Sequence, residues 1–386
     1  MQFYSLLNTS VGDFGHQADS LLLQGRHGIS EPTDCSAVHV EIQNAYGDLS
    51  KMHPVTAPAS VKITEDAIEI YFSPFRLTGK ERIAVSVRGE KTEYSPQTCD
   101  LCTVRGESDF NSFRENGVVY RMYIPSSDIP RPLILFLHGG GECGSDNRLQ
   151  LTGTMGAISL AERFPDFYIM APQAPDNGIS IASALQSMGS FSHFNHMDLG
   201  TPPDSGKSAR GWNRHCLAKI AAEIRRLIRA GKVDPARIYL TGMSMGGGGC
   251  LKMLSAAPEL FAAACIICPT MNSETYSILH ELPPVPSWIS CAYIDHQRNR
   301  HVFLLDACQH LWAQNRRDVK LTLFTAAELE KYGIGSTEGL TDAQIRSENH
   351  NCWTLVYHNE HHMLSWMTAQ VNRRISGCIL PSGAGI

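Results

Sequence analysis

The chain of 386 residues is predicted to combine a small all-β domain with a larger α/β domain. Two observations support this division. Short segments that alternate apolar and polar residues fill the region from about 36 to 88, and no helical period separates them. From residue 117 onward, apolar strand segments alternate with helical segments, as in a doubly wound, mostly parallel sheet. We therefore place the domains at residues 1–116 and 117–386.

The first domain is expected to contain four strands bounded by turn residues, at 38–42, 61–63, 67–72 and 83–87. Short strands with this patterning and turn-rich connections favour a β-sandwich of the immunoglobulin type. The polar segment 89–116 is expected to bridge the two domains.

Seven strands are expected in the second domain, at 118–124, 132–137, 167–171, 236–240, 261–268, 287–293 and 319–324. A helix is predicted over 217–230, where apolar residues recur with the helical period and basic residues occupy the last turns. Two stretches, at about 176–210 and 326–349, exceed what a minimal sheet needs. We expect them to be insertions that either shape the active site or form surface loops.

Composition excludes several classes of protein. Charged residues make up 18% of the chain and the formal net charge is −5, which gives no reason to expect nucleic acid as a partner. No apolar run reaches the ~18 residues of a membrane span. The first ten residues contain no Lys or Arg and do not resemble a signal peptide, so we expect a cytoplasmic protein.

The twelve cysteines do not form a recognisable metal-binding pattern. Two C-x-x-C pairs occur, Cys99/Cys102 and Cys265/Cys268, but neither has partners at the spacing of a zinc site, so no metal is expected. Cys250, Cys265 and Cys268 lie in apolar stretches typical of a core. The pair at Cys99 and Cys102 leaves open a local disulfide or two free thiols.

Ser244 is the candidate nucleophile, because it lies in the sequence GMSMG directly after the apolar strand at 236–240. A G-x-S-x-G motif between a strand and a helix is the nucleophile elbow of serine hydrolases. The tight turn exposes the hydroxyl at the end of the sheet. The backbone N–H of Met245, at the start of the helix, is then placed to stabilise an oxyanion.

A second glycine-rich turn, His138 to Gly141, follows the buried strand at 132–137. This HGGG motif is typical of the loop that supplies further oxyanion donors in esterases. The N–H groups of Gly140 and Gly141 are the candidates beside Met245.

A serine nucleophile needs a base and a carboxylate, and the chain order in this class is serine, acid, histidine. Asp295 follows the strand at 287–293 and is the candidate acid. Asp306 is the alternative, although it falls in an expected helix. For the base, periodicity does not choose among His350, His358, His361 and His362.

These motifs together resemble the predicted-peptidase branch of the α/β hydrolases, which includes bacterial esterases with an N-terminal immunoglobulin-like domain. Residues 136–151 read FLHGGGECGSDNRLQL, 171–175 read APQAP, and 234–247 contain the elbow in the family's RIYLTGxSMGG form. Pro286 to Ile289 with Asp295 is similar to the family's acid strand. The resemblance covers most of residues 117–370 and implies the α/β-hydrolase fold.

The same resemblance implies that His350 is the base, because residues 350–353 read HNCW and fit the family's H-x-x-W context. His361 and His362 would then lie on the C-terminal helix. The loop after Asp295 departs from the family pattern, since it carries His296, Arg300 and His301 in place of the usual Pro and Val.

The expected function is hydrolysis of a carboxylic ester through an acyl-enzyme, by a triad of Ser244, His350 and Asp295 without cofactor. The substrate is expected to be a small-molecule or peptidyl acyl compound. Amide or peptide cleavage is one alternative, and acyl transfer or cyclisation of a biosynthetic intermediate is another. A catalytically silent binding protein is the alternative from a different class. The N-terminal domain could bind a partner, mediate homo-oligomer formation or cover the active site.

Overall fold

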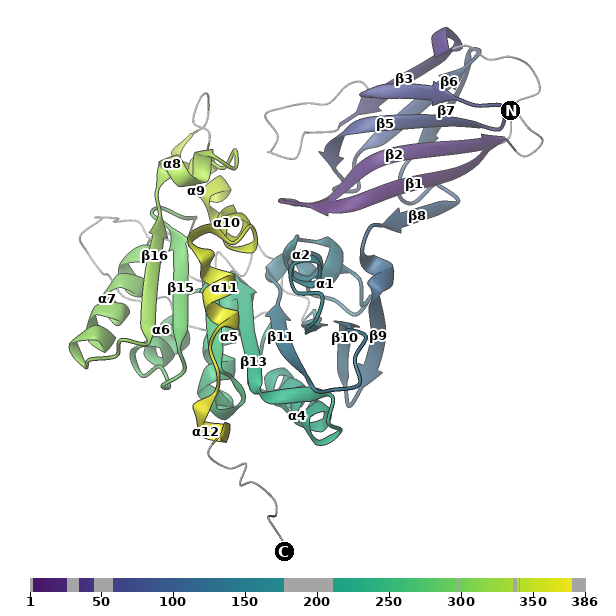
Figure 1. The fold of residues 1–386 in the computed structure, drawn as a ribbon. Coiled ribbons are helices and arrows are strands. Elements are labelled where there is room, and N and C mark those ends of the chain that lie inside the picture. The colour runs from purple at the N-terminus through teal and green to yellow at the C-terminus, as the bar shows by residue number, and fades with distance from the viewer. Residues whose placement is uncertain are drawn as a thin grey trace, which may run out of the picture. The chain divides into compact units, whose positions relative to one another are not determined.

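The computed structural model describes residues 3–25, 35–44, 58–176, 211–296, 299–335, 339 and 341–376. The chain divides into two compact units (Figure 1). One contains Met1–Asp109 with Leu151–Ile158, and the other contains Phe110–Gln150 with Ser159–Ile386. Apart from Asp176, the expected insertion at 176–210 lies outside the described residues.

The first unit contains two sheets, with strand orders β4-β5-β2-β1-β8 and β3-β6-β7. When its first seven strands are lettered A to G in chain order, the sheets read D-E-B-A and C-F-G. This is the arrangement of an immunoglobulin domain of the constant type, with β8 added beside β1. The strands are β1 (Phe3–Gly12), β2 (Gly15–Gly25), β3 (Val38–Gln43), β4 (Ser60–Ile63), β5 (Ala67–Arg76), β6 (Arg82–Val87), β7 (Glu90–Tyr94) and β8 (Leu101–Val104).

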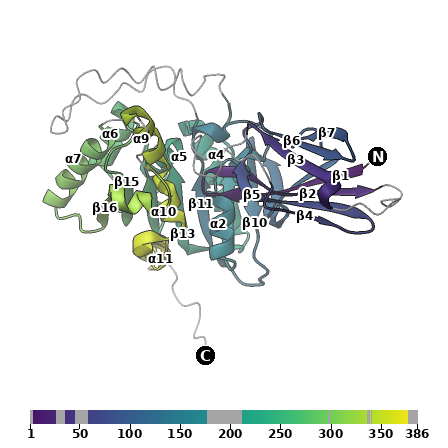
Figure 2. The same cartoon turned by 90° about the horizontal axis from the view of Figure 1, so that it is seen from above.

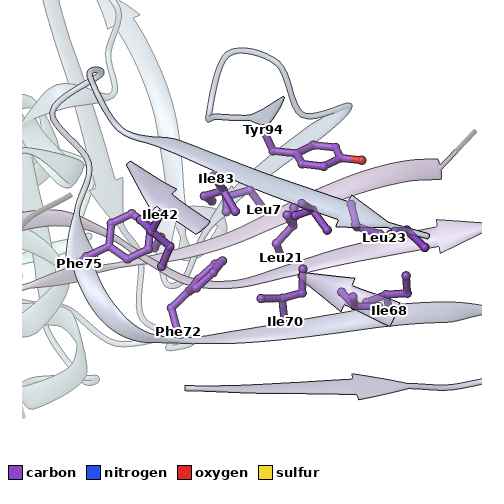
Figure 3. Packing of buried hydrophobic residues seen from close by; sticks show 14 residues of the cluster. Leu7, Leu21, Leu23, Ile42, Ile68, Ile70, Phe72, Phe75, Ile83 and Tyr94 are labelled. Atoms are coloured by element: carbon purple, nitrogen blue, oxygen red, sulfur yellow. The ribbon is translucent and has the colours of Figure 1, made fainter. Parts of the chain in front are cut away.

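Side chains from both sheets form one apolar core (Figure 3). Leu21 and Leu23 of β2 are fully buried, and Ile83 of the other sheet belongs to the same cluster. The rings of Phe72 and Phe75 meet edge to face with centroids 5.3 Å apart. Alternate residues of each strand therefore face a shared interior, as in a β-sandwich.

Two features of this unit differ from expectation. The hairpin of β1 and β2 was not predicted. Residues 89–116, expected to be a bridge, contain β7 and β8 of this unit and also β9 (Phe110–Glu115), which belongs to the second unit. Cys102 lies on β8 opposite Leu7 of β1. Cys99 and Cys102 are free thiols that pack against the core cluster, so the local disulfide is absent.

The second unit contains an eight-stranded sheet of order β16-β15-β14-β13-β11-β12-β10-β9. Its strands pair in parallel from β12 to β16, whereas β9 and β10 are antiparallel. This mostly parallel sheet confirms the predicted fold class. The remaining strands are β10 (Val118–Tyr123), β11 (Arg131–Leu137), β12 (Tyr168–Pro172), β13 (Val233–Met243), β14 (Ala263–Ile267), β15 (Ser287–Ala292) and β16 (Val319–Phe324).

Helices cover both faces of the eight-stranded sheet (Figures 1 and 2). The α-helices are α1 (Leu149–Thr152), α2 (Gly156–Arg163), α4 (Arg214–Arg229), α5 (Met245–Ala256), α6 (Ser273–His280), α7 (Arg300–Ala313), α8 (Ala326–Glu330), α9 (Asp342–Asn349), α10 (Trp353–Tyr357), α11 (Met363–Thr368) and α12 (Arg373–Ser376). Single 3₁₀ turns are Cys35–Ala37, Glu107–Asp109, Gly140–Glu142, Pro258–Leu260, His350–Cys352 and Glu360–His362. None of the helices in the described part of the chain has the length and apolar character that a membrane span requires.

The central strands explain where a site can form. All five residues of β12 and of β14 are buried, which agrees with the uninterrupted apolar runs of the sequence. Since β11, β13 and β15 point the same way, the segments after Leu137, Met243 and Ala292 emerge at one edge of the sheet. Ligands of open α/β sheets bind at this carboxyl edge.

Candidate active site

Ser244 lies in the turn between β13 and α5, with φ 56° and ψ −119°. A positive φ is uncommon for a residue with a side chain, and it identifies the turn as strained. The flanking glycines are required by close packing. A Cβ on Gly242 would lie 2.7 Å from the carbonyl oxygen of Leu137, and one on Gly246 would lie 1.9 Å from the same oxygen. The sequence GMSMG therefore permits the elbow to pack directly against the end of β11.

The structure brings Ser244, His350 and Asp295 into one hydrogen-bonded row. The Nε2 atom of His350 is 2.9 Å from Ser244 Oγ, and its Nδ1 atom is 3.0 Å from Asp295 Oδ2. Asp295 follows the end of β15, and its side chain is fully buried. His350 opens the 3₁₀ turn after α9. A base needs the first contact to accept the serine proton, and an acid needs the second contact to orient the base.

The charges in this row stabilise each other. Burial alone would raise the pKa of the Asp295 carboxyl, but the positive charges of Arg300 and His350 hold it well below its usual range. Burial alone would lower the pKa of His350, but the Asp295 carboxylate raises it to about 9. The carboxylate therefore remains ionised, and the imidazole becomes a strong base.

Two further side chains contact the Asp295 carboxylate, and neither was predicted as a site residue. The guanidinium of Arg300 forms an ion pair with Oδ1, and His296 Nδ1 lies 2.9 Å from the same oxygen. The ring of His296 also meets the ring of His350 edge to face, with centroids 3.9 Å apart. The signal in the sequence was the departure of this loop from the family pattern.

A buried thiol lies behind the histidine. Cys268, in the loop after β14, has its Sγ 3.7 Å from the carbonyl oxygen of His350. Burial would raise the pKa of this thiol, but the Cys352 thiol and the positive charges of His350 and Arg300 lower it to about 5. A negative charge on Cys268 in turn raises the pKa of His350.

The glycine loop after β11 approaches the serine. A Cβ on Gly139 would lie 3.8 Å from Ser244 Cβ, whereas a Cβ on Gly140 or Gly141 would meet no described atom within 4 Å. Met245 is the first residue of α5, so its N–H has no acceptor within the helix. The glycine loop thus comes close to Ser244 at Gly139, and Met245 directly follows the serine, whereas the role of the Gly140, Gly141 and Met245 N–H groups as oxyanion donors stays a prediction.

His138 holds this loop in place and takes no part in the row. Its Nε2 accepts a hydrogen bond from the Ala174 N–H at 2.9 Å, so its proton is on Nδ1, which donates to the Gly139 carbonyl at 2.7 Å. The indole of Trp212 donates to the His138 carbonyl at 3.0 Å. These bonds tie the loop to the segments after β12 and before α4.

Other motif residues also have structural roles. Gln173 donates to the carbonyl of Glu142 at 3.1 Å and to the Asp146 carboxylate at 2.7 Å. It also accepts from the backbone N–H of Asn147 at 2.8 Å. The APQAP and DNRLQ segments therefore fasten the glycine loop to β12.

The alternative acid and bases lie elsewhere. Asp306 is on α7 and accepts hydrogen bonds from Tyr276 and His280. His361 lies 2.7 Å from Glu328. His361 and His362 precede α11 with left-handed backbone angles, which corrects the expectation that they lie on the C-terminal helix.

Within the described residues, one group offers three ligand atoms at metal-binding distances, namely Asp295, His296 and His350. The buried guanidinium of Arg300 contacts the same carboxylate and opposes any added cation. We therefore assign no metal to this group.

Residues 206–376 match the sequence model of the prolyl oligopeptidase family. No curated protein sequence matches the chain. The crystal structure of a thermostable esterase aligns at 20% identity with a TM-score of 0.62, and the alignment covers 95% of this chain and 99% of that one.

Two other solved structures align less closely. Staphylococcus aureus S-formylglutathione hydrolase has 12% identity and a TM-score of 0.42, with 67% of this chain and 95% of that chain covered. The Pyrococcus horikoshii acylaminoacyl peptidase has 12% identity and a TM-score of 0.41, with 81% and 50% covered. The family match and the fold together identify the chain as a serine hydrolase with the α/β-hydrolase fold.

Proposed function

We propose that the protein hydrolyses carboxylic esters through a triad of Ser244, His350 and Asp295. The observation that carries this proposal is the continuous row of hydrogen bonds from the Asp295 carboxylate through His350 to the hydroxyl of Ser244. The serine lies on an elbow at the carboxyl edge of the sheet, where substrates of this class of fold reach the nucleophile.

In the proposed reaction, Ser244 Oγ attacks the acyl carbon while Nε2 of His350 takes its proton. The N–H groups of Gly140, Gly141 and Met245 stabilise the resulting oxyanion. When the intermediate collapses, His350 gives the proton to the departing alcohol and the acyl group remains on Ser244. Water, deprotonated by His350, then releases the acid and restores the serine.

Peptide or amide cleavage is the second candidate, because residues 206–376 match the prolyl oligopeptidase family. The esterase likeness extends over 95% of this chain and is the reason that we place ester hydrolysis first. Amide hydrolysis requires protonation of a poorer leaving group by the same His350. A pair of substrates with the same acyl group, one an ester and the other an anilide, separates the two activities.

The first experiment is labelling with a fluorophosphonate probe, which reacts with activated serines. Wild-type protein should label, and Ser244→Ala should not. His350→Ala should label at least ~10³-fold more slowly, because the serine loses its base. His362→Ala is the matched control, since this histidine lies outside the row of contacts and should leave labelling unchanged.

Two outcomes would contradict the proposal. Unchanged labelling of His350→Ala would remove His350 from the role of base. Folded wild-type protein that neither labels nor cleaves short acyl esters would refute the proposed ester hydrolysis.

We also propose that residues 117–386 form the catalytic domain and that the N-terminal sandwich has a non-catalytic role. In this proposal, the sandwich mediates homo-oligomer formation. Sedimentation of the full chain and of a chain that lacks residues 1–109 tests the second part, and a full chain that sediments as a monomer would refute it.

A further inference from the structure

The Asp295 carboxylate contacts the side chains of His350, Arg300 and His296. Oδ2 faces Nδ1 of His350 at 3.0 Å, while Oδ1 contacts both the Arg300 guanidinium and Nδ1 of His296. Arg300 itself is 1% exposed, and its Nε donates to the Pro269 carbonyl at 3.0 Å. A buried arginine therefore connects the candidate acid to the segment after β14.

Arg300 also lies against the base. Its Nη1 is 3.0 Å from His350 Nδ1. A guanidinium has no acceptor, and in the catalytic arrangement Nδ1 carries the proton that Asp295 accepts. Two donors therefore face each other at this contact, and the positive charge of Arg300 opposes a positive charge on His350.

The groups around His350 have opposing effects. The negative charges of the Asp295 carboxylate and the Cys268 thiolate raise the pKa of His350, whereas the positive charge of Arg300 lowers it. His296 has its own pKa lowered to about 4 by burial and by the His350 charge, so it is neutral where the enzyme would act. Cys352 is in contact with Cys268, and the pKa of its thiol is raised by burial. Arg300 is thus the cation that opposes protonation of the base.

We propose that Arg300 is a positioning residue of the active site, which fixes the Asp295 carboxylate and weakens the base strength that this carboxylate gives to His350. The proposal rests on the triad proposed above. It gives Arg300 two separable actions, because the planar fork of the guanidinium sets the geometry of Oδ1 and its charge acts on His350.

Two substitutions separate these actions. Arg300→Gln removes the charge and the fork, so the acidic limb of the pH profile of kcat/KM should move up by about one pH unit and kcat should fall roughly 10–100-fold. Arg300→Lys keeps the charge and loses the fork. Its limb should stay where it is in the wild type, and its kcat should still fall roughly tenfold.

Arg316→Gln is the matched control. Arg316 also pairs with a carboxylate, Asp318, and donates to the carbonyls of Leu282 and Pro283. It lies just before β16, at the amino end of the parallel strands, whereas Asp295 follows the carboxyl end of β15. Its loss removes a comparable set of contacts and should leave both the pH limb and kcat of the folded protein unchanged.

Each variant is measured by esterase kinetics and by the rate of fluorophosphonate labelling from pH 6 to 10, scaled to the folded fraction from circular dichroism. A limb that stays in place or moves down in Arg300→Gln would overturn the proposal. If Arg300→Gln does not fold, Arg300→Lys with wild-type kcat overturns it. Wild-type protein that neither labels nor cleaves esters refutes the triad proposal instead, so the two failures are distinguishable.

Discussion

Substitution of Gly246 by alanine tests whether close packing of the elbow sets the active-site geometry. The added Cβ would lie 1.9 Å from the Leu137 carbonyl oxygen and 2.6 Å from that of His138. A carbon and a carbonyl oxygen normally stay about 3.3 Å apart, so α5 and the glycine loop must separate by about 1.4 Å. Overpacking of this kind costs about 3 kcal/mol, or roughly 6–12 °C in Tm for a domain of this size. The displaced oxyanion donors should lower kcat/KM about 100-fold.

Gly248→Ala is the matched control within the same helix. Its Cβ would lie 3.3 Å from the Thr270 carbonyl oxygen and 3.6 Å from Thr270 Cβ, which requires only a small adjustment. The gain in helix propensity, about 0.5–1 kcal/mol, offsets that adjustment. Thermal unfolding gives Tm and esterase kinetics give kcat/KM for both variants. If Gly246→Ala matches Gly248→Ala in Tm and in kcat/KM, close packing does not set the geometry of the elbow.

Three more predictions concern the surroundings of His350. The pKa of His350 is raised to about 9, and only the neutral ring accepts a proton, so kcat/KM should rise about tenfold per pH unit from pH 7 to 8. A pH profile of kcat/KM that is flat above pH 7 would contradict this. Cys268→Ala removes a negative charge that raises the pKa of His350, so the acidic limb should move down by about one pH unit, and an upward shift in the kinetics would refute the assignment. Asn349→Ala removes the 3.0 Å hydrogen bond to the carbonyl of Ile294, next to Asp295, and should cost about 1–3 kcal/mol in urea unfolding and lower kcat; wild-type values for both would show that the bond is dispensable.

The parallel sheet could be predicted because its strands are buried on both faces. The apolar runs at 132–137 and 261–268 correspond to β11 and β14 within a few residues. The hairpin of β1 and β2 was missed for the opposite reason. Its strands are half-buried at many positions and include polar residues such as Asn8, Gln17 and Ser20, so the alternation that marks a strand is weak in the sequence.

The candidate site divides in the same way. Ser244 and Asp295 could be proposed from the residues alone, because each follows a recognisable strand at the carboxyl edge of the sheet. His350 follows α9, a short helix within an expected insertion, and no strand precedes it directly. Spacing therefore could not separate it from the other histidines, and only the resemblance of its H-x-x-W context pointed to it.

Arg300 could be proposed neither from a strand position nor from the resemblance, because its role depends on the start of α7 lying beside the end of β15. Arg300 is the first residue of α7, five positions after Asp295 in the sequence, and its guanidinium contacts the carboxylate. The sequence shows a charged loop, which more often indicates a solvated surface. Because Arg300 is buried, its charge acts strongly on neighbouring groups. A buried cation opposes protonation of a neighbouring histidine, whereas a buried thiolate favours it. Opposite shifts of the acidic limb in Arg300→Gln and Cys268→Ala would therefore indicate that His350 is the group that titrates.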